Sequence, residues 1–361
     1  MNYSALLQKV ITEIKPADQA LYDACLAKWD SLAMPLRSLG DLQVNTAKMA
    51  ACMGTTDVCL DKRTLIVVCA DNGVIANGVT QSTEAVTTAV TMALGTGTST
   101  ANYMATAARC DLLPVDIGMK ETGTYEGVLN KNIRPGTDDL SKGPAMSRKE
   151  CMAAMEVGIT LVKDQKEAGT NIILIGEMGI GNTTTTAAVG SVLLGQEPVV
   201  MTGRGAGLSD EGLQKKIKCI EDGIRINQPD AKDPVDVIAK VGGLDIACLC
   251  GICLGGAYYG VPVLLDGVIT NIAALAAIKL NPAVKDAVFA SHVSLEPAAQ
   301  ITLEALGMKA PIHANLHLGE GTGATVALSM YDVVLAEYNS NHSFDVLGID
   351  EYTEQYEGQL N

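Results

Sequence analysis

The stretch that decides the fold is Ile172-Ile-Leu-Ile-Gly-Glu-Met-Gly-Ile-Gly-Asn-Thr-Thr184. A short apolar run is followed by a glycine-rich turn and then by Asn182 and Thr183, polar residues that suit the start of a helix. This order predicts a buried strand, a tight turn and a helix. Glycines let the backbone approach a ligand, and the N–H groups at a helix start favour an anion. The turn is therefore a candidate ligand site, with a plain strand-to-helix turn as the alternative.

The same alternation of short apolar runs and longer helical patterns extends along most of the chain. Strands are predicted at Leu65–Cys69, Leu113–Ile117, Ile172–Ile175, Val199–Met201, Val261–Leu265 and Ala287–Ala290. Helices are predicted at Glu84–Leu94, Thr98–Ala108, Arg148–Ala168, Thr184–Leu194, Glu211–Ile224 and Asn271–Ile278. Such alternation implies right-handed crossovers and a mostly parallel sheet, whose ligands bind beyond the carboxyl ends of the strands. The stretch Glu121–Lys142 is predicted as a long loop.

Both ends of the chain lack strand signals. The first part is predicted to form two helices, Tyr3–Ile14 and Gln19–Leu32, and the tail after Leu335 is polar and acidic. We therefore expect a large α/β domain over residues 36–335. Residues 1–35 and 336–361 are expected to form a small helical domain together.

The composition excludes several classes of protein. The 361 residues include 26 Lys and Arg against 41 Asp and Glu, a formal net charge of −15. This balance argues against nucleic acid and against an anionic membrane surface, because both need clustered basic residues. With 48% hydrophobic and 19% charged residues, the chain is too apolar to be disordered. A globular protein with a sizeable core is expected.

Ten cysteines lie mostly inside apolar stretches, and the sequence does not begin with a secretory signal. Reduced, buried thiols in a cytoplasmic protein are the simplest interpretation. The spacing Cys250-Gly-Ile-Cys253 is an alternative redox or metal motif, but no second cysteine pair or nearby histidine completes it.

An uncharged stretch, Ile246–Leu265, is long enough to raise the question of a membrane span. Its glycines, its proline and its acidic flanks favour a buried helix over Asp245–Tyr259 and a buried strand after it.

Four glycine-rich segments follow predicted strands. They are Ala70-Asp-Asn-Gly-Val74, Gly176-Glu-Met-Gly-Ile-Gly-Asn-Thr-Thr184, Gly203-Arg-Gly-Ala-Gly207 and Gly319-Glu-Gly-Thr-Gly323. None has the spacing of a Walker loop or of a dinucleotide-binding fingerprint. Glu177 and Glu320 lie inside such segments, where poor solvation would raise the pKa of a carboxyl and suit it to act as a general base. The alternative is a solvated loop glutamate.

Basic and imidazole side chains give weaker signals. Lys215 and Lys216 follow the third glycine segment and either reach a phosphate or lie on a solvated helix face. His292, His313 and His317 show no zinc-binding spacing, so no metal site is expected.

Together these segments resemble the nicotinate-nucleotide–dimethylbenzimidazole phosphoribosyltransferase family, which activates the lower ligand of cobamides. The matching stretches are Cys69-Ala-Asp-Asn-Gly-Val74, Gly176–Thr184, Gly203–Gly207 with Glu211-Gly-Leu213 and Lys216, Asp233-Pro234, Leu265-Asp-Gly267, Ser291-His-Val-Ser-Leu-Glu-Pro297 and Leu318-Gly-Glu-Gly-Thr-Gly323. They span roughly residues 36–335.

The resemblance implies an enzyme, a pentosyltransferase. It moves the phosphoribosyl group of nicotinate mononucleotide to a free lower-ligand base, releases nicotinate and forms an α-linked nucleotide. The implied fold is a doubly wound, Rossmann-like parallel sheet of six strands with a small helical domain built from both chain ends. No metal or organic cofactor is implied. The implied assembly is a dimer, either homomeric or with a paralogous subunit.

The resemblance also implies roles for individual residues. Glu320 matches the general base that takes the proton of the attacking base, and Glu177 matches a second active-site carboxylate. The residues implied to hold the phosphate and ribose are Gly179, Gly181, Asn182, Thr183, Gly203, Arg204, Gly205, Lys216, Ser294, Gly319 and Gly321. Those implied to bind the acceptor base are Ser82, Val90, Met178 and Asp266.

Two positions depart from the family pattern. Asp71-Asn72-Gly73 stands where Asp-His-Gly is more usual, so Asn72 replaces a histidine. Val90 stands where relatives carry glutamine. Replacing an amide by an isopropyl group leaves a more apolar wall. Dimethylbenzimidazole, benzimidazole and phenolic acceptors therefore rank ahead of purines, and the acceptor stays open. A non-catalytic subunit that stabilises an active homologue is the alternative, which the retained Gly-Glu-Gly-Thr-Gly loop disfavours.

Overall fold

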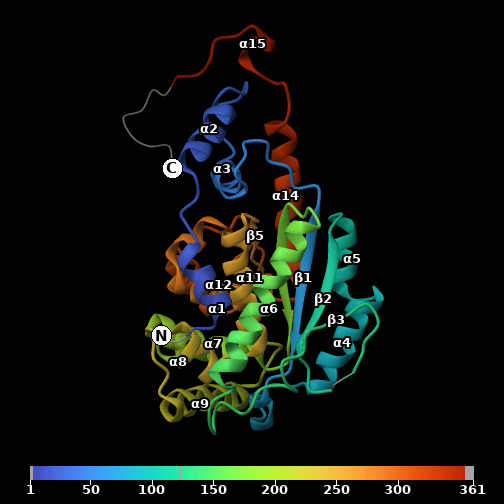
Figure 1. Ribbon diagram of the computed structural model, residues 1–361, viewed down its shortest axis with the longest axis vertical. Helices are drawn as coiled ribbons and strands as arrows, with labels where there is room; N and C mark the ends of the chain where they lie inside the picture. The colour runs from blue at the N-terminus through green and yellow to red at the C-terminus, as the bar shows by residue number, and fades with distance from the viewer. Residues whose placement is uncertain (1–2, 122, 354–361) are drawn as a thin grey trace.

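The computed structural model describes residues 3–121 and 123–353 and shows a parallel sheet with helices on both faces (Figure 1). The strands are β1 (Arg63–Ala70), β2 (Asp111–Gly118), β3 (Leu129–Asn130), β4 (Ile172–Met178), β5 (Val263–Leu264) and β6 (Val288–Phe289). The α-helices are α1 (Ala5–Glu13), α2 (Gln19–Asp30), α3 (Asp41–Met53), α4 (Glu84–Thr96), α5 (Thr100–Ala107), α6 (Arg148–Glu167), α7 (Asn182–Leu194), α8 (Pro198–Met201), α9 (Asp210–Asn227), α10 (Pro234–Val241), α11 (Leu244–Tyr259), α12 (Val268–Leu280), α13 (Ala298–Leu306), α14 (Thr322–Tyr338) and α15 (Phe344–Leu347). Two 3-10 helices cover Gly73–Asn77 and Pro282–Asp286.

The strand order across the sheet is β3-β2-β1-β4-β5-β6, and every pairing is parallel over the described residues. The chain builds one half of the sheet outward from β1 and then returns to build the other half from β4. Strand order therefore reverses between β1 and β4, and such a switch point opens a crevice at the carboxyl ends of these strands. The predicted doubly wound fold of six parallel strands is confirmed.

The strands are buried on both faces because each face meets its own helix layer. In β1, Ile66 and Val68 belong to the core formed with α6 and α11, whereas Leu65 and Val67 belong to the core formed with α5 and α14. Side chains alternate between the two faces of a strand, so an unbroken apolar run fills both cores.

Two predictions about strands are wrong. Val199–Met201 is part of the short helix α8, in which Val199 and Val200 are exposed; Pro198 occupies the first turn, where its missing N–H costs nothing. The sixth strand is instead β3, inside the stretch predicted as a loop. It contains two residues and pairs with β2 only, so the sequence carries no apolar run to mark it.

Helices α6 and α11 cross in direct backbone contact. A Cβ at Gly251 would lie 2.0 Å from the Met155 carbonyl oxygen, and one at Gly158 would lie 2.1 Å from the Cys248 carbonyl oxygen. Residues 244–256 of α11 are buried, as predicted for this stretch. Within residues 3–121 and 123–353, no helix is both long enough and apolar enough to cross a membrane.

This contact predicts that Gly251→Ala lowers the free energy of unfolding by about 3 kcal/mol, because both backbones must move apart. The sign is diagnostic, since alanine normally stabilises a helix relative to glycine by about 1 kcal/mol. Gly143→Ala is the matched control, because nothing lies within 4 Å of a Cβ there. Urea denaturation measures both variants; equal stability would contradict the close crossing.

The first helix, α1, and the last described helix, α15, lie in different places (Figure 1). Helix α1 packs on α6 and α11, and Ser4 donates a hydrogen bond to Glu156 of α6. Helix α2 packs on α3 and on the end of α14, where the Trp29 and Tyr338 ring centroids are 4.8 Å apart. A β-bridge joins Leu32 to Ser343. The division at residues 35 and 336 stays a prediction, and residues 1–2 and 354–361 of the small domain lie outside the described residues.

Candidate active site

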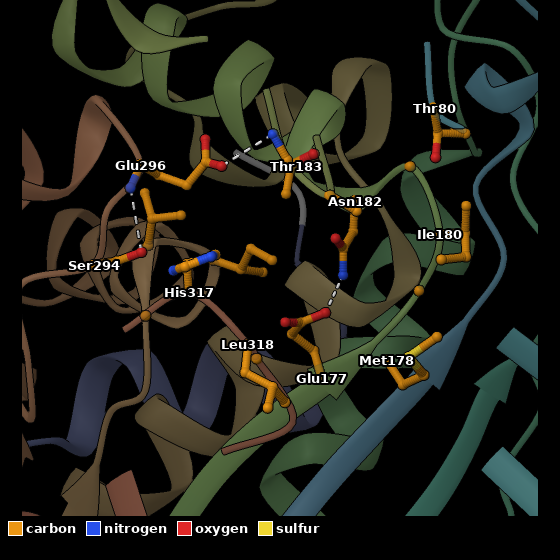
Figure 2. Close-up of a pocket in the computed structure, with 18 of the residues that line it drawn as sticks. Thr80, Glu177, Met178, Ile180, Asn182, Thr183, Ser294, Glu296, His317 and Leu318 are labelled. Carbon is orange, nitrogen blue, oxygen red and sulfur yellow. Dashed lines mark hydrogen bonds between the residues drawn. The ribbon is translucent and has the colours of Figure 1, made fainter. Parts of the chain in front are cut away.

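A cavity of about 190 Å³ opens beyond the carboxyl ends of the central strands, at the switch point of the sheet (Figure 2). Six segments line it: residues 79–81, the turn after β4, the loop before α9, the loop after β5, the loop after β6 and the turn before α14. Thirteen of the predicted site residues line it: Glu177, Met178, Gly179, Gly181, Asn182, Thr183, Arg204, Gly205, Lys216, Asp266, Ser294, Gly319 and Glu320.

Glu320 lies in a constrained turn at the start of α14. Gly319, Glu320 and Gly321 have φ angles of 95°, 57° and 78°, so a non-glycine residue is held in the left-handed region between two glycines. Such a backbone costs about 1–3 kcal/mol and persists only where its surroundings hold it. A Cβ at Gly176 of β4 would lie 2.2 Å from the Gly321 nitrogen, so the turn rests directly on the strand.

Asp266, predicted to bind the acceptor base, holds this turn. Its carboxylate accepts hydrogen bonds from the backbone N–H groups of Gly321 (3.1 Å), Gly323 (2.8 Å) and Ala324 (3.1 Å). These are N–H groups at the start of α14 that the helix itself leaves free. Asp266 therefore positions Glu320.

The carboxyl of Glu320 is partly shielded from water, and its Oε2 atom is buried with no hydrogen-bond partner in the described structure. Burial raises its pKa above the ordinary value, and Asp266 raises the pKa further, while the Ala101 backbone N–H opposes both. This is the direction predicted for a carboxyl in a glycine turn. An unpaired oxygen on a group with a raised pKa suits proton abstraction near neutral pH.

Glu177 lies at the end of β4 and is buried, with 8% of its surface exposed. Asn182 at the start of α7 donates a hydrogen bond to it (Figure 2). Burial raises the pKa of Glu177 well above its ordinary value, and the buried Asp245 carboxylate is the next cause. The pKa of Asp245 is itself raised by burial to about 6. Sequence analysis missed Asp245, which begins a helix without any motif around it.

A buried cation also lines the cavity. Lys216 is 1% exposed, and its Nζ donates hydrogen bonds to Thr183 Oγ1 (2.7 Å) and the Gly203 carbonyl oxygen (3.0 Å). Burial lowers the pKa of Lys216 to about 8, while Glu296 opposes the shift. Lys215 is exposed, so the structure separates the two lysines that the sequence left equivalent.

Glu296 is a second residue that sequence analysis missed. Its Oε1 accepts a hydrogen bond from the Gly205 N–H (3.1 Å), so it holds the glycine loop beside Lys216. Its signal was its place in Ser291-His-Val-Ser-Leu-Glu-Pro297, from which only Ser294 was selected. Arg204 lines the cavity, but its guanidinium is half exposed and pairs with Asp210.

Four predicted residues are not among those that line the cavity. Gly203 and Gly321 lie just behind it and act through backbone atoms, as described above. Ser82 is half-buried beside Thr80, and Val90 packs against the core that contains α14. The acceptor-binding roles of Ser82 and Val90 stay predictions.

The other polar clusters give no further site. The ten cysteines, all within the described ranges, are free thiols. Among residues 3–121 and 123–353, no group of three or more His, Cys, Asp or Glu side chains is placed to hold a metal ion.

Comparisons with known proteins agree on one family. A family model described as "Phosphoribosyltransferase" matches residues 14–349. A nicotinate-nucleotide–dimethylbenzimidazole phosphoribosyltransferase of Acetivibrio thermocellus is 42% identical over 333 residues, which cover 92% of this chain and 95% of the relative. One of Ruminiclostridium cellulolyticum, with the same name, is 41% identical over 345 residues, covering 96% and 98%. The crystal structure of CobT from Thermus thermophilus superposes with a TM-score of 0.86 at 33% identity, covering 92% and 100%.

Proposed function

The chain belongs to the nicotinate-nucleotide–dimethylbenzimidazole phosphoribosyltransferase family, and from this we propose how its cavity performs the reaction. The enzyme is a pentosyltransferase that moves the phosphoribosyl group of nicotinate mononucleotide to dimethylbenzimidazole and releases nicotinate. The alternative, a non-catalytic subunit, is not favoured by these relatives. The residue roles that follow are our proposal.

The observation that carries the proposal is the polarity of the cavity. The buried ammonium of Lys216 is hydrogen-bonded to Thr183, and two carboxyls with raised pKa values, Glu177 and Glu320, lie at the end of β4 and in the turn before α14. A phosphate needs the cation, and a developing positive charge needs the carboxyls. A mononucleotide therefore fits in one orientation, with its phosphate at Lys216 and its C1′ atom near Glu320.

The reaction balances with Glu320 as the general base. The bond between C1′ and the pyridinium nitrogen breaks, and its electron pair returns to the nicotinate ring, which leaves neutral at that nitrogen. The bare ring nitrogen of the acceptor forms the new bond to C1′ with its lone pair, and the proton on the other ring nitrogen passes to Glu320. The sugar passes through an oxocarbenium-like state, which the nearby carboxyls favour. Because the leaving group is already good, binding and orientation supply much of the rate.

We assign the acceptor to a part of the cavity wall that carries apolar side chains. Met178, Ile180 and Leu318 supply these side chains (Figure 2), and Glu320 lines the same cavity. Such a wall suits a flat aromatic ring without polar groups at its rim. We therefore propose benzimidazoles and phenolics ahead of purines, whose exocyclic polar groups would lose hydrogen bonds to water. A phenolic acceptor would attack through oxygen and pass its proton to the same carboxylate.

A competition assay tests the acceptor. The enzyme is mixed with nicotinate mononucleotide and equal amounts of dimethylbenzimidazole, phenol and adenine, and the α-nucleotides are identified by mass spectrometry. We expect products of the benzimidazole or the phenol in excess over the adenine product. Exclusive use of adenine would contradict the ranking.

We also propose a cytoplasmic dimer, with an identical or a paralogous partner. Free thiols are typical of a reducing compartment. Apolar side chains stand exposed on neighbouring helices, Tyr103 on α5 and Val326 and Val333 on α14, and such a face supports an interface.

A further inference from the structure

His292 lies after β6, lines the cavity and is 3% exposed, yet the proposed reaction gives it no role. A buried imidazole has one nitrogen that donates and one that accepts, and which is which depends on the neighbours. The neighbours of His292 determine this.

Ser291 fixes the tautomer. Its Oγ lies 3.0 Å from the Asp266 carbonyl oxygen and 2.9 Å from His292 Nδ1. A carbonyl oxygen only accepts, so the single hydroxyl proton of Ser291 points to Asp266. Ser291 must then accept from His292, and Nδ1 carries the proton. The Nε2 atom is left with a lone pair.

The two edges of the ring face different surroundings. A Cβ at Gly323, at the start of α14, would lie 2.1 Å from Nδ1, so this edge is packed against the helix. A Cβ at Gly267 would lie 3.6 Å from Nε2 and 3.7 Å from the Ser294 Cβ, and both residues line the cavity. No hydrogen bond to Nε2 is present among the described residues. The lone pair of Nε2 therefore lies on the cavity side.

The ring stays neutral. Burial lowers the pKa of His292 below its ordinary value, and the Asp266 carboxylate, 4.0 Å from Nδ1, does not reverse the shift. A neutral imidazole with a bare Nε2 accepts a hydrogen bond and repels phosphate and carboxylate oxygens. The ligand group it fits is therefore a donor.

We propose that His292 Nε2 accepts a hydrogen bond from a ribose hydroxyl of the bound mononucleotide, with Ser291 as the residue that orients the ring. The inference rests on the proposed function, because it takes nicotinate mononucleotide as the ligand. His292 lies between Ser294, which the family resemblance assigns to the phosphate and ribose, and Asp266, which holds the Glu320 turn, so it faces the middle of the ligand. A neutral imidazole also avoids the electrostatic repulsion that an imidazolium would exert on the positively charged sugar.

The test is a binding cycle with nicotinate mononucleotide and its 2′-deoxy and 3′-deoxy analogues, measured by calorimetry without acceptor. With the wild-type enzyme, one analogue is expected to bind about tenfold more weakly than the parent. His292→Phe keeps a planar ring but removes Nε2. This variant should bind nicotinate mononucleotide about tenfold more weakly than the wild type does. It should bind the same deoxy analogue as tightly as it binds nicotinate mononucleotide. If wild type and His292→Phe lose the same factor with both analogues, the proposal is wrong.

Ser291→Ala provides a second variant that leaves the imidazole in place. It should reduce the discrimination against the same deoxy analogue, because Nδ1 no longer has its fixed acceptor. Unchanged discrimination would overturn the role of Ser291 in setting the tautomer. Release of nicotinate by wild-type enzyme with dimethylbenzimidazole is recorded separately. Failure of that release would count against the proposed function, whereas the binding cycle decides the role of His292.

Discussion

Glu320→Gln is expected to lower kcat by about 100- to 10,000-fold, the range that a general base contributes, while binding of nicotinate mononucleotide is retained. The amide has the same shape and cannot take a proton. The turn should survive, because it is held through backbone N–H groups by Asp266 and by contact with Gly176, not through the Glu320 side chain. Nicotinate release followed by liquid chromatography measures the rate, and calorimetry measures the binding.

The pH profile provides an independent check on the same residue. Glu320 acts as a base only when deprotonated, so kcat/KM should fall as the pH is lowered through its pKa. Because burial raises that pKa, the fall should begin above pH 4.5, the ordinary value for a glutamate. Glu304→Gln, an exposed glutamate on α13, controls for the change in charge. A wild-type rate in Glu320→Gln would contradict the assignment of Glu320 as the general base.

Lys216→Met is expected to raise the KM for nicotinate mononucleotide by about 100-fold, equivalent to ~2.7 kcal/mol, with a smaller effect on kcat. The methionine keeps the length of the side chain and fills the buried space but cannot donate to a phosphate. Loss of folding is not expected, since an apolar side chain replaces a desolvated ammonium. Lys215→Met is the matched control, because that neighbouring lysine is exposed and should leave KM unchanged.

The lowered pKa of Lys216 predicts that nucleotide affinity depends on pH in the wild type but not in Lys216→Met. With its pKa lowered to about 8, the free enzyme loses the ammonium charge as the pH rises above 8. Affinity for the nucleotide should therefore fall between pH 7 and pH 9 in the wild type, and the same titration with Lys216→Met should be flat. Parallel pH profiles for the two proteins would show that Lys216 does not contact the phosphate.

Long apolar runs were the most predictable part of the fold. The predicted strand at Leu65–Cys69 lies within β1, because a strand buried on both faces leaves an unbroken apolar signal. The predicted strand at Leu113–Ile117 lies within β2, although Asp116 interrupts its apolar residues. β3 was missed because two paired residues leave no such signal. Val199–Met201 was assigned wrongly because β-branched residues also occur in exposed helical turns, where no neighbouring strand is in reach.

The candidate site divides in the same way. Glu177, Glu320 and the glycine turns were visible because glycine flanking a carboxylate is a local pattern. Glu296, Asp245 and His292 were not selected, since each depends on partners distant in the chain: Glu296 on Gly205, Asp245 on Glu177, and His292 on the Asp266 carbonyl oxygen that fixes the Ser291 hydroxyl. No spacing within one segment reports a contact between segments.

By itself, then, the sequence determined the parallel α/β architecture, the glycine turns at the strand ends and the two carboxylates within them, because these depend on neighbours along the chain. Only the tertiary structure decided which lysine is buried, that Asp266 serves as a clamp for the Glu320 turn, and which nitrogen of His292 is free. Burial and hydrogen-bond partners are set by segments that meet across the switch point of the sheet, and a linear pattern does not contain those distances.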